Sequence, residues 1–314
     1  MSKPLVINST VMEKKLPVAV IVLTKDEQIH IERCISNAMC VSNEVYVVDS
    51  ESTDNTRSIA EGMGAKAVVH PWPGNYSEQF NWALDNLPLK SEWVLRLDAD
   101  EYLTDELIEE LYEKVPQLPA DVSGIILPLR RIFLGRQIKR GTGRIELLRL
   151  FRRGKGRSET RLMDEHIQLS EGITVKMTGE FADDNLNNLS WWTQKHVGYA
   201  IREAVDLLDM EYDLTGAARG DESRHISEQA QAKRMKKHKY ARRPLFWRST
   251  AYFLYRYILR GGFLEGKEGF LWHFLQGWWY RTLVDAKVLE LKRKSGGDRK
   301  KIIEILNNEY GIRL

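Results

Sequence analysis

Apolar runs alternate with helix-like segments along the first 120 residues. The run at 17–23 (PVAVIVL) is continuous and rich in β-branched residues, which is typical of a strand buried on both faces. Shorter runs of this kind predict three more strands, and the spacing between them predicts helices. The predicted strands are 17–23, 44–48, 66–70 and 92–97, and the predicted helices are 29–39, 55–62, 75–87 and 104–114. This alternation indicates an α/β fold with a mostly parallel sheet.

The pattern changes beyond residue 120. Between 123 and 175, short apolar runs broken by Gly and Arg predict antiparallel strands that complete the same domain. Residues 190–213 show helical spacing, whereas 215–227 are polar and contain glycine. We therefore expect four parts: a polar leader (1–16), an α/β domain (17–213), a mobile connection (214–230) and a C-terminal helical region (231–314).

The composition is that of an ordinary globular protein, but the charge is uneven. The 314 residues are 43% hydrophobic and 10% aromatic, which excludes a chain disordered throughout, a collagen-like repeat and a disulfide scaffold. Residues 1–120 contain 20 acidic and 10 basic residues, whereas 121–314 contain 24 acidic and 37 basic residues. The first part therefore favours contact with cations, and the second favours contact with anions.

Cysteine usage and the lack of long apolar segments predict a cytoplasmic protein. Cys34 and Cys40 are six positions apart, which fits neither a zinc pair nor a secreted disulfide framework, so we expect both to be reduced. The beginning of the chain lacks the apolar stretch of a signal peptide. No segment offers the roughly 18 consecutive apolar residues that would cross a bilayer.

A basic stretch and an aromatic-rich stretch overlap in the C-terminal region. Residues 231–260 contain ten Lys or Arg and no Asp or Glu, and residues 246–280 contain 13 of the 30 aromatic residues. Aromatic rings lie at headgroup depth while Lys and Arg contact anionic lipid, so we expect peripheral binding to the inner face of the cytoplasmic membrane. A homo-oligomer interface rich in Trp, Tyr and Arg is the alternative. Nucleic acid is not expected, because no nucleic-acid-binding motif is present.

The segment Asp98-Ala99-Asp100 directly follows the fourth predicted strand. Two carboxylates one residue apart at the end of a buried strand supply the oxygen ligands that Mg²⁺ and Mn²⁺ prefer. Such a cation would bridge diphosphate oxygens and neutralise charge on a departing nucleotide. A solvated turn is the alternative interpretation of this DxD triplet.

The first two predicted strands also end in polar residues. Thr24 to Glu27 follow the first strand and Asp49 ends the second, so three strand ends bring polar groups to one edge of the sheet. Asp49 is suited to accepting an N–H from a base, and Glu27 or Asp98 to binding ribose hydroxyls. Helix capping is the alternative role for Asp49 and Asp54.

Several segments together resemble a known family. The runs VAVIVLTKDEQ, EVYVVDSESTDNT, FNWALDN and WVLRLDADE are similar to the nucleotide-sugar half of inverting GT-A glycosyltransferases of family 2. Three later pieces resemble the subgroup of lipopolysaccharide-core β-1,4-glucosyltransferases and related envelope-glycan enzymes. These pieces are 163–166 (MDEH), 195–200 (KHVGYA) and 262–270 (GFLEGKEGF). The resemblance covers about residues 17–290 and implies the GT-A fold, a Rossmann-like, mostly parallel sheet.

The resemblance also implies roles for individual residues. Nucleoside contacts are implied for Thr24, Glu27 and Asp49, and contacts to ribose and to the metal-bound diphosphate are implied for Asp98 and Asp100. A further pair in the predicted helix 75–87 is expected to face the nucleotide sugar, unless it lies on an exposed helix face; the pair is Gln79 and Asn81.

Displacement at an anomeric carbon also needs a base opposite the leaving nucleotide. Many family members carry Glu-Asp where this chain has Asp-Glu-His, so we favour Glu165 as the base, with Asp164 next. We expect His166 to orient that carboxylate or to join the metal ligands, with a purely structural role as the alternative. Three nearby arginines are candidates to pair with diphosphate or with an anionic acceptor, and a solvated loop is the alternative; they are Arg149, Arg152 and Arg153. Packing is the favoured explanation for His196 and Tyr199, which share a helix face.

The sequence therefore predicts a metal-dependent inverting glycosyltransferase. We expect it to move a sugar, UDP-linked by resemblance, to a lipid-linked or lipopolysaccharide-type glycan at the membrane. A sugar nucleotidyltransferase is the first alternative, but it would normally carry a Gly-rich phosphate loop after the first strand, and residues 24–28 (TKDEQ) contain no glycine. A non-catalytic membrane-surface scaffold is the second alternative.

Overall fold

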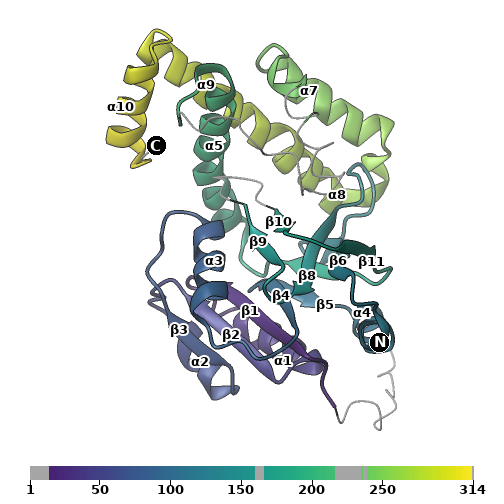
Figure 1. Ribbon diagram of the computed structural model, residues 1–314. Coiled ribbons are helices and arrows are strands. Elements are labelled where there is room, and N and C mark those ends of the chain that lie inside the picture. The colour runs from purple at the N-terminus through teal and green to yellow at the C-terminus, as the bar shows by residue number, and fades with distance from the viewer. Residues whose placement is uncertain (1–13, 160–165, 216–234, 236–238, 313–314) are drawn as a thin grey trace. The chain divides into compact units, whose positions relative to one another are not determined.

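The computed structural model describes residues 14–159, 166–215, 235 and 239–312 (Figure 1). The chain divides into two compact units. The first unit comprises the described residues of Met1–Arg130, Ile145–Glu159 and Ile167–Leu186. The second unit comprises the described residues of Arg131–Arg144, Thr160–His166 and Asn187–Leu314.

A sheet of ten strands is the main structure of the first unit; the end of β6 and the short β7 are assigned to the second unit. The strands are β1 (Val18–Thr24), β2 (Glu44–Asp49), β3 (Lys66–Val69), β4 (Trp93–Asp98), β5 (Glu101–Leu103), β6 (Val122–Phe133), β7 (Arg136–Gln137), β8 (Glu146–Arg152), β11 (Ile173–Lys176) and β12 (Phe181–Asp184). Their order is β3-β2-β1-β4-β8-β6-β12-β5, with β7 and β11 paired to β6. A separate antiparallel pair is formed by β9 (Gly156–Ser158) and β10 (Ile167–Leu169).

The strand directions confirm the predicted α/β class and correct one detail. The first four strands, β1 to β4, pair in parallel, as predicted. Strand β8 runs antiparallel to both β4 and β6, also as predicted. The expectation that residues 123–175 are all antiparallel is wrong, because β11 runs parallel to β6. Before this pairing the chain returns to the beginning of β6, where Ile173 N donates to Asp121 O at 2.9 Å.

The predicted burial of β1 on both faces is confirmed. Val18, Val20 and Val22 point into one apolar cluster, and Ile21 and Leu23 point into another. Successive side chains of a strand project to opposite faces, so each face needs its own cover. The first cluster includes residues of α1 (Ile31–Val41) and α4 (Asp105–Lys114), and the second includes residues of α3 (Tyr76–Asn86). The polar ends of β1, β2 and β4 are therefore held on a rigid, close-packed support.

Two helices of the first unit begin with a side-chain cap. The predicted cap at Thr104 is confirmed, because its Oγ1 accepts from Leu107 N at the beginning of α4. Asn75 caps α3 in the same way through Glu78 N at 2.8 Å. The remaining helical elements of the first unit are α2 (Thr56–Gly62) and the 3₁₀ turn η1 (Val115–Gln117).

The second unit is built mainly from helices. They are α5 (Leu189–Tyr212), α7 (Trp247–Leu254), the π-helical η2 (Tyr255–Leu259), the 3₁₀ turn η3 (Gly262–Glu265), α8 (Gly266–Trp272), the π-helical η4 (His273–Trp279), α9 (Tyr280–Ser295) and α10 (Arg299–Tyr310). The second unit includes the whole of α5, whose apolar side, including Ala204 and Leu208, packs in one cluster with Val284 and Leu291 of α9. The predicted domain boundary at 213 stays a prediction. Most of the predicted mobile connection, 214–230, lies outside the described residues.

Neither cysteine forms a disulfide, in agreement with the expectation of reduced thiols. Within the described part of the chain, we find no helix whose length and apolar character would let it span a bilayer.

His196 packs inside the second unit, as favoured from the sequence. Its ring stacks on Trp192 with centroids 3.5 Å apart and meets Tyr199 and Tyr280 edge-on. Burial lowers the pKa of His196 to about 4, and the nearby charge of Lys195 contributes in the same direction.

The second unit should therefore lose stability as the pH falls from about 6.5 to 4. In this window the unfolded chain protonates His196 while the folded chain resists, so protons favour unfolding. Each unit of pKa difference corresponds to about 1.4 kcal/mol. Urea unfolding followed by tryptophan fluorescence should show a shallower pH dependence for His196→Gln than for the unchanged protein. An identical pH profile in both proteins would contradict this assignment.

Candidate functional site

Three parallel strands bring polar residues to the same edge of the sheet. In the register of the sheet Thr24 pairs with Asp49, and Leu23 pairs with Asp98. The ends of β1, β2 and β4 therefore lie side by side, as predicted from their sequences. Ligands of open α/β sheets bind beyond such carboxyl ends, and this edge is the candidate site.

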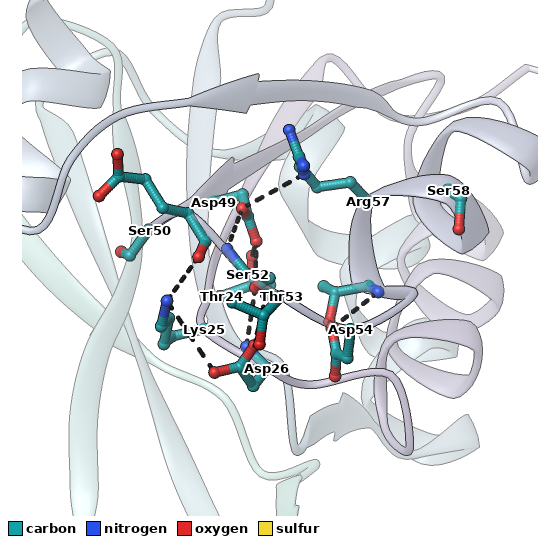
Figure 2. Close-up of polar contacts among 12 residues, drawn as sticks. Thr24, Lys25, Asp26, Asp49, Ser50, Ser52, Thr53, Asp54, Arg57 and Ser58 are labelled. Carbon is teal, nitrogen blue, oxygen red and sulfur yellow. Dashed lines mark hydrogen bonds and ion pairs between the residues drawn. The ribbon is translucent and has the colours of Figure 1, made fainter.

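Figure 2 shows how the loops after β1 and β2 are joined at this edge. Thr24 Oγ1 donates to Asp49 Oδ2 at 3.0 Å, and Ser52 donates to the same carboxylate through its hydroxyl at 2.5 Å and its N–H at 2.8 Å. Asp26 N donates to Ser52 Oγ at 2.7 Å, and Thr53 N donates to Asp26 Oδ1 at 2.7 Å. The two loops thus form one hydrogen-bonded platform.

Asp49 has a structural role, although it joins two loops and is not the cap of α2. Its side chain is fully buried, and it accepts three hydrogen bonds from Thr24 and Ser52. Arg57 Nε lies 3.7 Å from Asp49 Oδ1. A carboxylate has about four lone-pair positions, so most of this acceptor capacity is used within the fold. The predicted contact between Asp49 and a base stays a prediction.

Glu27 is held in place by His30, which the sequence analysis did not select. Leu186 N donates to His30 Nε2 at 2.8 Å, so this nitrogen carries no proton. In a neutral ring the proton then lies on Nδ1, which donates to Glu27 Oε2 at 2.6 Å. Glu27 N also donates to Thr56 Oγ1 at 2.8 Å. Both the backbone and the carboxylate of Glu27 are therefore fixed before any ligand binds.

Replacing His30 with Phe should lower the free energy of unfolding by about 1–3 kcal/mol, because Leu186 N–H would lose its acceptor inside the protein. Urea unfolding measures this change. Glu27→Gln is the matched control, since its amide oxygen can still accept from His30 Nδ1, and we expect a shift below about 1 kcal/mol. Equal losses in the two variants would contradict the proposed tautomer.

The first aspartate of the DxD triplet lies between two arginines. Asp98 Oδ1 is 3.7 Å from Arg96 Nη2, and Asp98 Oδ2 is 3.6 Å from Arg149 Nη2. Its side chain is 39% exposed, whereas both arginines are buried. Asp98 is thus a partly accessible carboxylate with two buried guanidinium groups beside it.

The second aspartate is connected to β12 and α1. Asn185 Nδ2 donates to Asp100 Oδ2 at 2.9 Å, and Asp184 N donates to Asp100 O at 3.1 Å. Arg33 of α1 joins the same two segments, because it donates to Asp184 Oδ2 at 2.7 Å and to Asp100 O at 3.3 Å. The position of Asp100 is therefore set by residues 67 to 85 positions away in the sequence.

Glu101 and Arg149 form a buried ion pair behind the two aspartates. Arg149 Nη2 lies 2.5 Å from Glu101 Oε1, and Glu101 Oε2 accepts from Asp98 N at 2.9 Å. Burial raises the pKa of Glu101 well above its usual range; Arg149 opposes this rise, and Asp98 and Asp100 add to it. Burial also raises the pKa of the Cys34 thiol, with contributions from the same three carboxylates, so this cysteine is not a nucleophile here.

Gln79 and Asn81 both bind other parts of the first unit. Gln79 is fully buried and donates to Ser50 Oγ at 3.1 Å, while its Oε1 is 2.6 Å from His70 Nδ1. Asn81 donates to Ser158 O at 2.8 Å and accepts from Ser158 N at 2.9 Å, which ties α3 to β9. Neither side chain is on an exposed helix face, and their predicted contact with a donor stays a prediction.

The alternative of a solvated loop does not describe Arg149, Arg152 and Arg153, because each of them contacts other parts of the first unit. Arg149 lies at the DxD triplet, as described above, whereas Arg152 stacks on Trp93 and donates to Val122 O at 2.7 Å. Arg153 Nε donates to Ser91 O at 2.9 Å. Of the three, Arg149 therefore lies at the candidate site, and the other two fasten the strand to its neighbours.

The predicted base candidates Asp164 and Glu165 lie outside the described residues. His166, which follows them, is half-buried and begins the described segment before β10. Its role as an orienting residue or metal ligand stays a prediction.

The residues at the strand edge fit a divalent cation that is shared with a ligand. Among the residues that the structure describes, no group of three or more His, Cys, Asp or Glu is arranged to hold a metal by itself. Mg²⁺ is commonly held by one or two carboxylates together with phosphate oxygens and water, so a complete protein cage is not needed. Asp98 and Asp100, both only partly buried, supply such a pair.

Comparison with known proteins identifies the segment that carries this site. Residues 19–168 match the family model described as glycosyl transferase family 2. An uncharacterized glycosyltransferase from Rickettsia bellii (strain RML369-C) is 45% identical over 103 residues, which are 33% of this chain and 33% of that protein. A second, from Rickettsia conorii (strain ATCC VR-613 / Malish 7), is 42% identical over 104 residues, 33% and 35% of the two chains. This chain therefore spans about a third of the length of these curated relatives.

Two solved structures show weaker likeness. Glucosyl-3-phosphoglycerate synthase from Mycobacterium tuberculosis, in complex with Mn²⁺, UDP and glucosyl-3-phosphoglycerate, is 18% identical with a TM-score of 0.30, covering 40% of this chain and 47% of that one. Mannosyl-3-phosphoglycerate synthase from Rubrobacter xylanophilus is 19% identical with a TM-score of 0.32, covering 37% and 41%.

The family match begins in β1 and ends in β10, so it contains the three strand ends, the linked loops and the DxD triplet. The expected resemblance to family 2 is confirmed, while the lipopolysaccharide-core subgroup stays a prediction. Residues 19–168, just under half of this chain, are thus similar to glycosyl transferase family 2.

Proposed function

We propose that this protein is a metal-dependent, inverting glycosyltransferase. It transfers a sugar from a nucleotide diphosphate donor, with UDP as the proposed nucleotide, to a lipid-linked or lipopolysaccharide-type glycan at the cytoplasmic face of the membrane. The observation that carries the proposal is the edge formed by β1, β2 and β4. There Glu27 is fixed and Asp98 is accessible within the family 2 segment.

Different residues that the structure describes would bind different parts of the donor. The fixed carboxylate of Glu27 is suited to accepting hydrogen bonds from nucleoside hydroxyls, while Arg149 and Arg96 place positive charge beside Asp98. Asp98 and Asp100 would hold Mg²⁺ or Mn²⁺, with His166 as a further proposed ligand. When bound, the cation would stabilise negative charge on the departing diphosphate.

Inversion requires a base on the side of the sugar opposite the diphosphate. We propose Glu165 for this step and Asp164 as the second candidate, on the basis of the sequence alone. The base takes the proton of the acceptor hydroxyl as its oxygen forms the bond to the anomeric carbon. The bond to the diphosphate breaks in the same displacement, so the configuration at that carbon inverts.

A product assay separates this proposal from its alternatives. The protein is incubated with a panel of UDP-sugars and Mn²⁺, and the release of nucleoside diphosphate is measured with and without EDTA. Diphosphate release that stops when EDTA is added supports the transferase. Pyrophosphate formed from a nucleoside triphosphate and a sugar phosphate would instead indicate a nucleotidyltransferase. Absence of both products would favour the scaffold.

A further inference from the structure

The helical segment Trp247–Leu259, formed by α7 and η2, has an inverted distribution of polar and apolar residues. Its fully buried residues are all polar: Arg248, Ser249 and Arg256. Its exposed residues are all apolar or aromatic: Trp247, Ala251, Leu254, Tyr255, Ile258 and Leu259. These positions follow helical spacing, so they form one continuous stripe on the outer side of the helix. A helix of a water-facing surface has the opposite arrangement.

Specific contacts fix the polar side inward. Arg248 forms an ion pair with Asp285 of α9, and Ser249 Oγ lies 3.0 Å from Thr282 Oγ1 of the same helix. Arg256 donates to Gln276 Oε1 of η4 at 2.7 Å. Rotating the helix to bury its apolar stripe would break all of these contacts, and leaving a buried charge unpaired is strongly unfavourable. The apolar stripe is therefore held outward by the fold.

The apolar surface continues beyond the helix into η3 and α8. Phe263, Leu264 and Phe270 are exposed, and the ring of Tyr257 contacts both Phe263 and Phe270 with centroids 6.4 and 5.7 Å apart. We call these three residues together with the six exposed residues of Trp247–Leu259 the inverted face. Contiguous exposed apolar surface of this kind marks a site of interaction.

The charges around the inverted face favour an anionic partner. The two acidic residues of 239–270 are both engaged: buried Glu265 accepts from Arg140 N at 2.8 Å, and Glu268 pairs with Arg136 at 3.3 Å. The exposed charged residues of this stretch are all basic; they are Lys239, Arg242, Arg243, Arg260 and Lys267. A second copy of the chain would bring an identical set of basic residues against this one, which is unfavourable.

We propose that the inverted face inserts into the headgroup region of an anionic lipid bilayer. Trp247, Leu259 and their apolar neighbours enter the boundary between headgroups and acyl chains, and the basic residues contact lipid phosphates. This inference rests on the proposed function, because it assigns the surface that would bring the transferase to a lipid-linked acceptor.

Vesicle flotation of the full chain tests the inference. The probe is phosphatidylcholine vesicles with and without about a third phosphatidylglycerol at moderate salt. We expect the protein to float with the anionic vesicles and to remain largely unbound with the neutral ones. The double variant Trp247→Glu/Leu259→Glu should lower the partition to anionic vesicles at least about ten-fold. Both positions are about three-quarters exposed, so folding should be preserved.

The matched control alters exposed apolar residues of the first unit. Val69→Glu/Ile173→Glu adds the same negative charge at positions that are 45% and 55% exposed, and its flotation should decrease much less. Equal losses in both double variants, or equal flotation of the unchanged protein with neutral and anionic vesicles, would overturn the inference. Two results together would also overturn the inference. The unchanged protein would bind no vesicles, and it would form a dimer in solution that the Trp247→Glu/Leu259→Glu variant converts to monomer.

Failure of this inference can be separated from failure of the proposed function. The Trp247→Glu/Leu259→Glu variant should still release UDP from a donor sugar in solution, whereas Asp100→Ala should float normally but release UDP far more slowly than the unchanged protein. Vesicle binding without UDP release by the unchanged protein would refute the transferase and leave the lipid surface standing. UDP release by the unchanged protein without vesicle binding would refute the lipid surface and leave the transferase standing.

Discussion

Asp100→Ala is expected to reduce sugar transfer by about a hundred- to a thousand-fold, because it removes a carboxylate proposed to hold the cation beside the diphosphate. The fold should survive, since the Asp100 side chain is partly exposed and its described hydrogen bond, from Asn185, joins two polar groups at the edge of the sheet. Initial rates of UDP release at saturating donor, measured over a range of Mn²⁺ concentrations, give the effect. The urea unfolding midpoint of the same variant checks its folding.

Asp85→Ala is the matched control for this variant. Asp85 is an exposed aspartate of α3 that pairs with Arg157 at 2.7 Å, so its loss removes a carboxylate from the same unit at a site unrelated to the strand edge. Its rate should stay within about two-fold of the unchanged protein, in line with the small contribution of surface ion pairs. If Asp100→Ala behaved like Asp85→Ala, with the same Mn²⁺ dependence, the proposed cation site would be wrong.

Asp285→Ala is expected to lower the free energy of unfolding of the second unit by about 3–5 kcal/mol. Arg248 and Asp285 are both buried and form a direct ion pair at 2.5 Å, and Asp285 Oδ2 also accepts from Phe246 N at 2.7 Å. Without Asp285, the guanidinium charge would remain buried with no carboxylate beside it. Urea unfolding followed through the tryptophans of the second unit measures the loss.

The double variant Arg248→Leu/Asp285→Leu tests whether the lost stability comes from the unpaired charge of Arg248. Replacing both members of a buried pair with apolar residues is often close to neutral, so most of the lost stability should return. A double variant as unstable as Asp285→Ala would show that packing or the bond to Phe246 N, rather than the unpaired charge, accounts for the loss.

Much of the first unit could be predicted from sequence because its signals are local. The continuous apolar runs identify β1, β2 and β4, and parallel pairing then places Thr24, Asp49 and Asp98 at one edge. The cap at Thr104 follows from a preference that acts over three residues. In each case the residues that decide the structure are close in the sequence, or their relation follows from topology.

The connections that fix the site are not local and could not be predicted. Arg33 contacts Asp184, which is 151 positions later, and Asn185 contacts Asp100, 85 positions earlier. His30 carries a weak signal, because it is three residues after Glu27 at the beginning of a helix, but its second partner, Leu186 N, is 156 positions away. The burial of Gln79 and the hydrogen bonds of Asn81 likewise depend on partners outside their own helix.

The composition of the C-terminal region also does not show which side of its helices is buried and which is exposed. The cluster of basic and aromatic residues predicts a surface for anionic lipid, but the usual pattern would have placed Arg248 and Arg256 outside. Asp285 and Gln276, on later elements, reverse that expectation by binding these arginines inside the second unit.

His30, which precedes α1, and Arg33 in its first turn bind the last residues of the first unit. His30 accepts from Leu186 N and Arg33 binds Asp184, while the same two side chains hold Glu27 and the backbone of Asp100. The segment 184–186 and both parts of the proposed donor site are therefore held by the same two side chains. We accordingly expect natural variation at 184–186 to change donor affinity, even where the altered side chain does not contact a nucleotide.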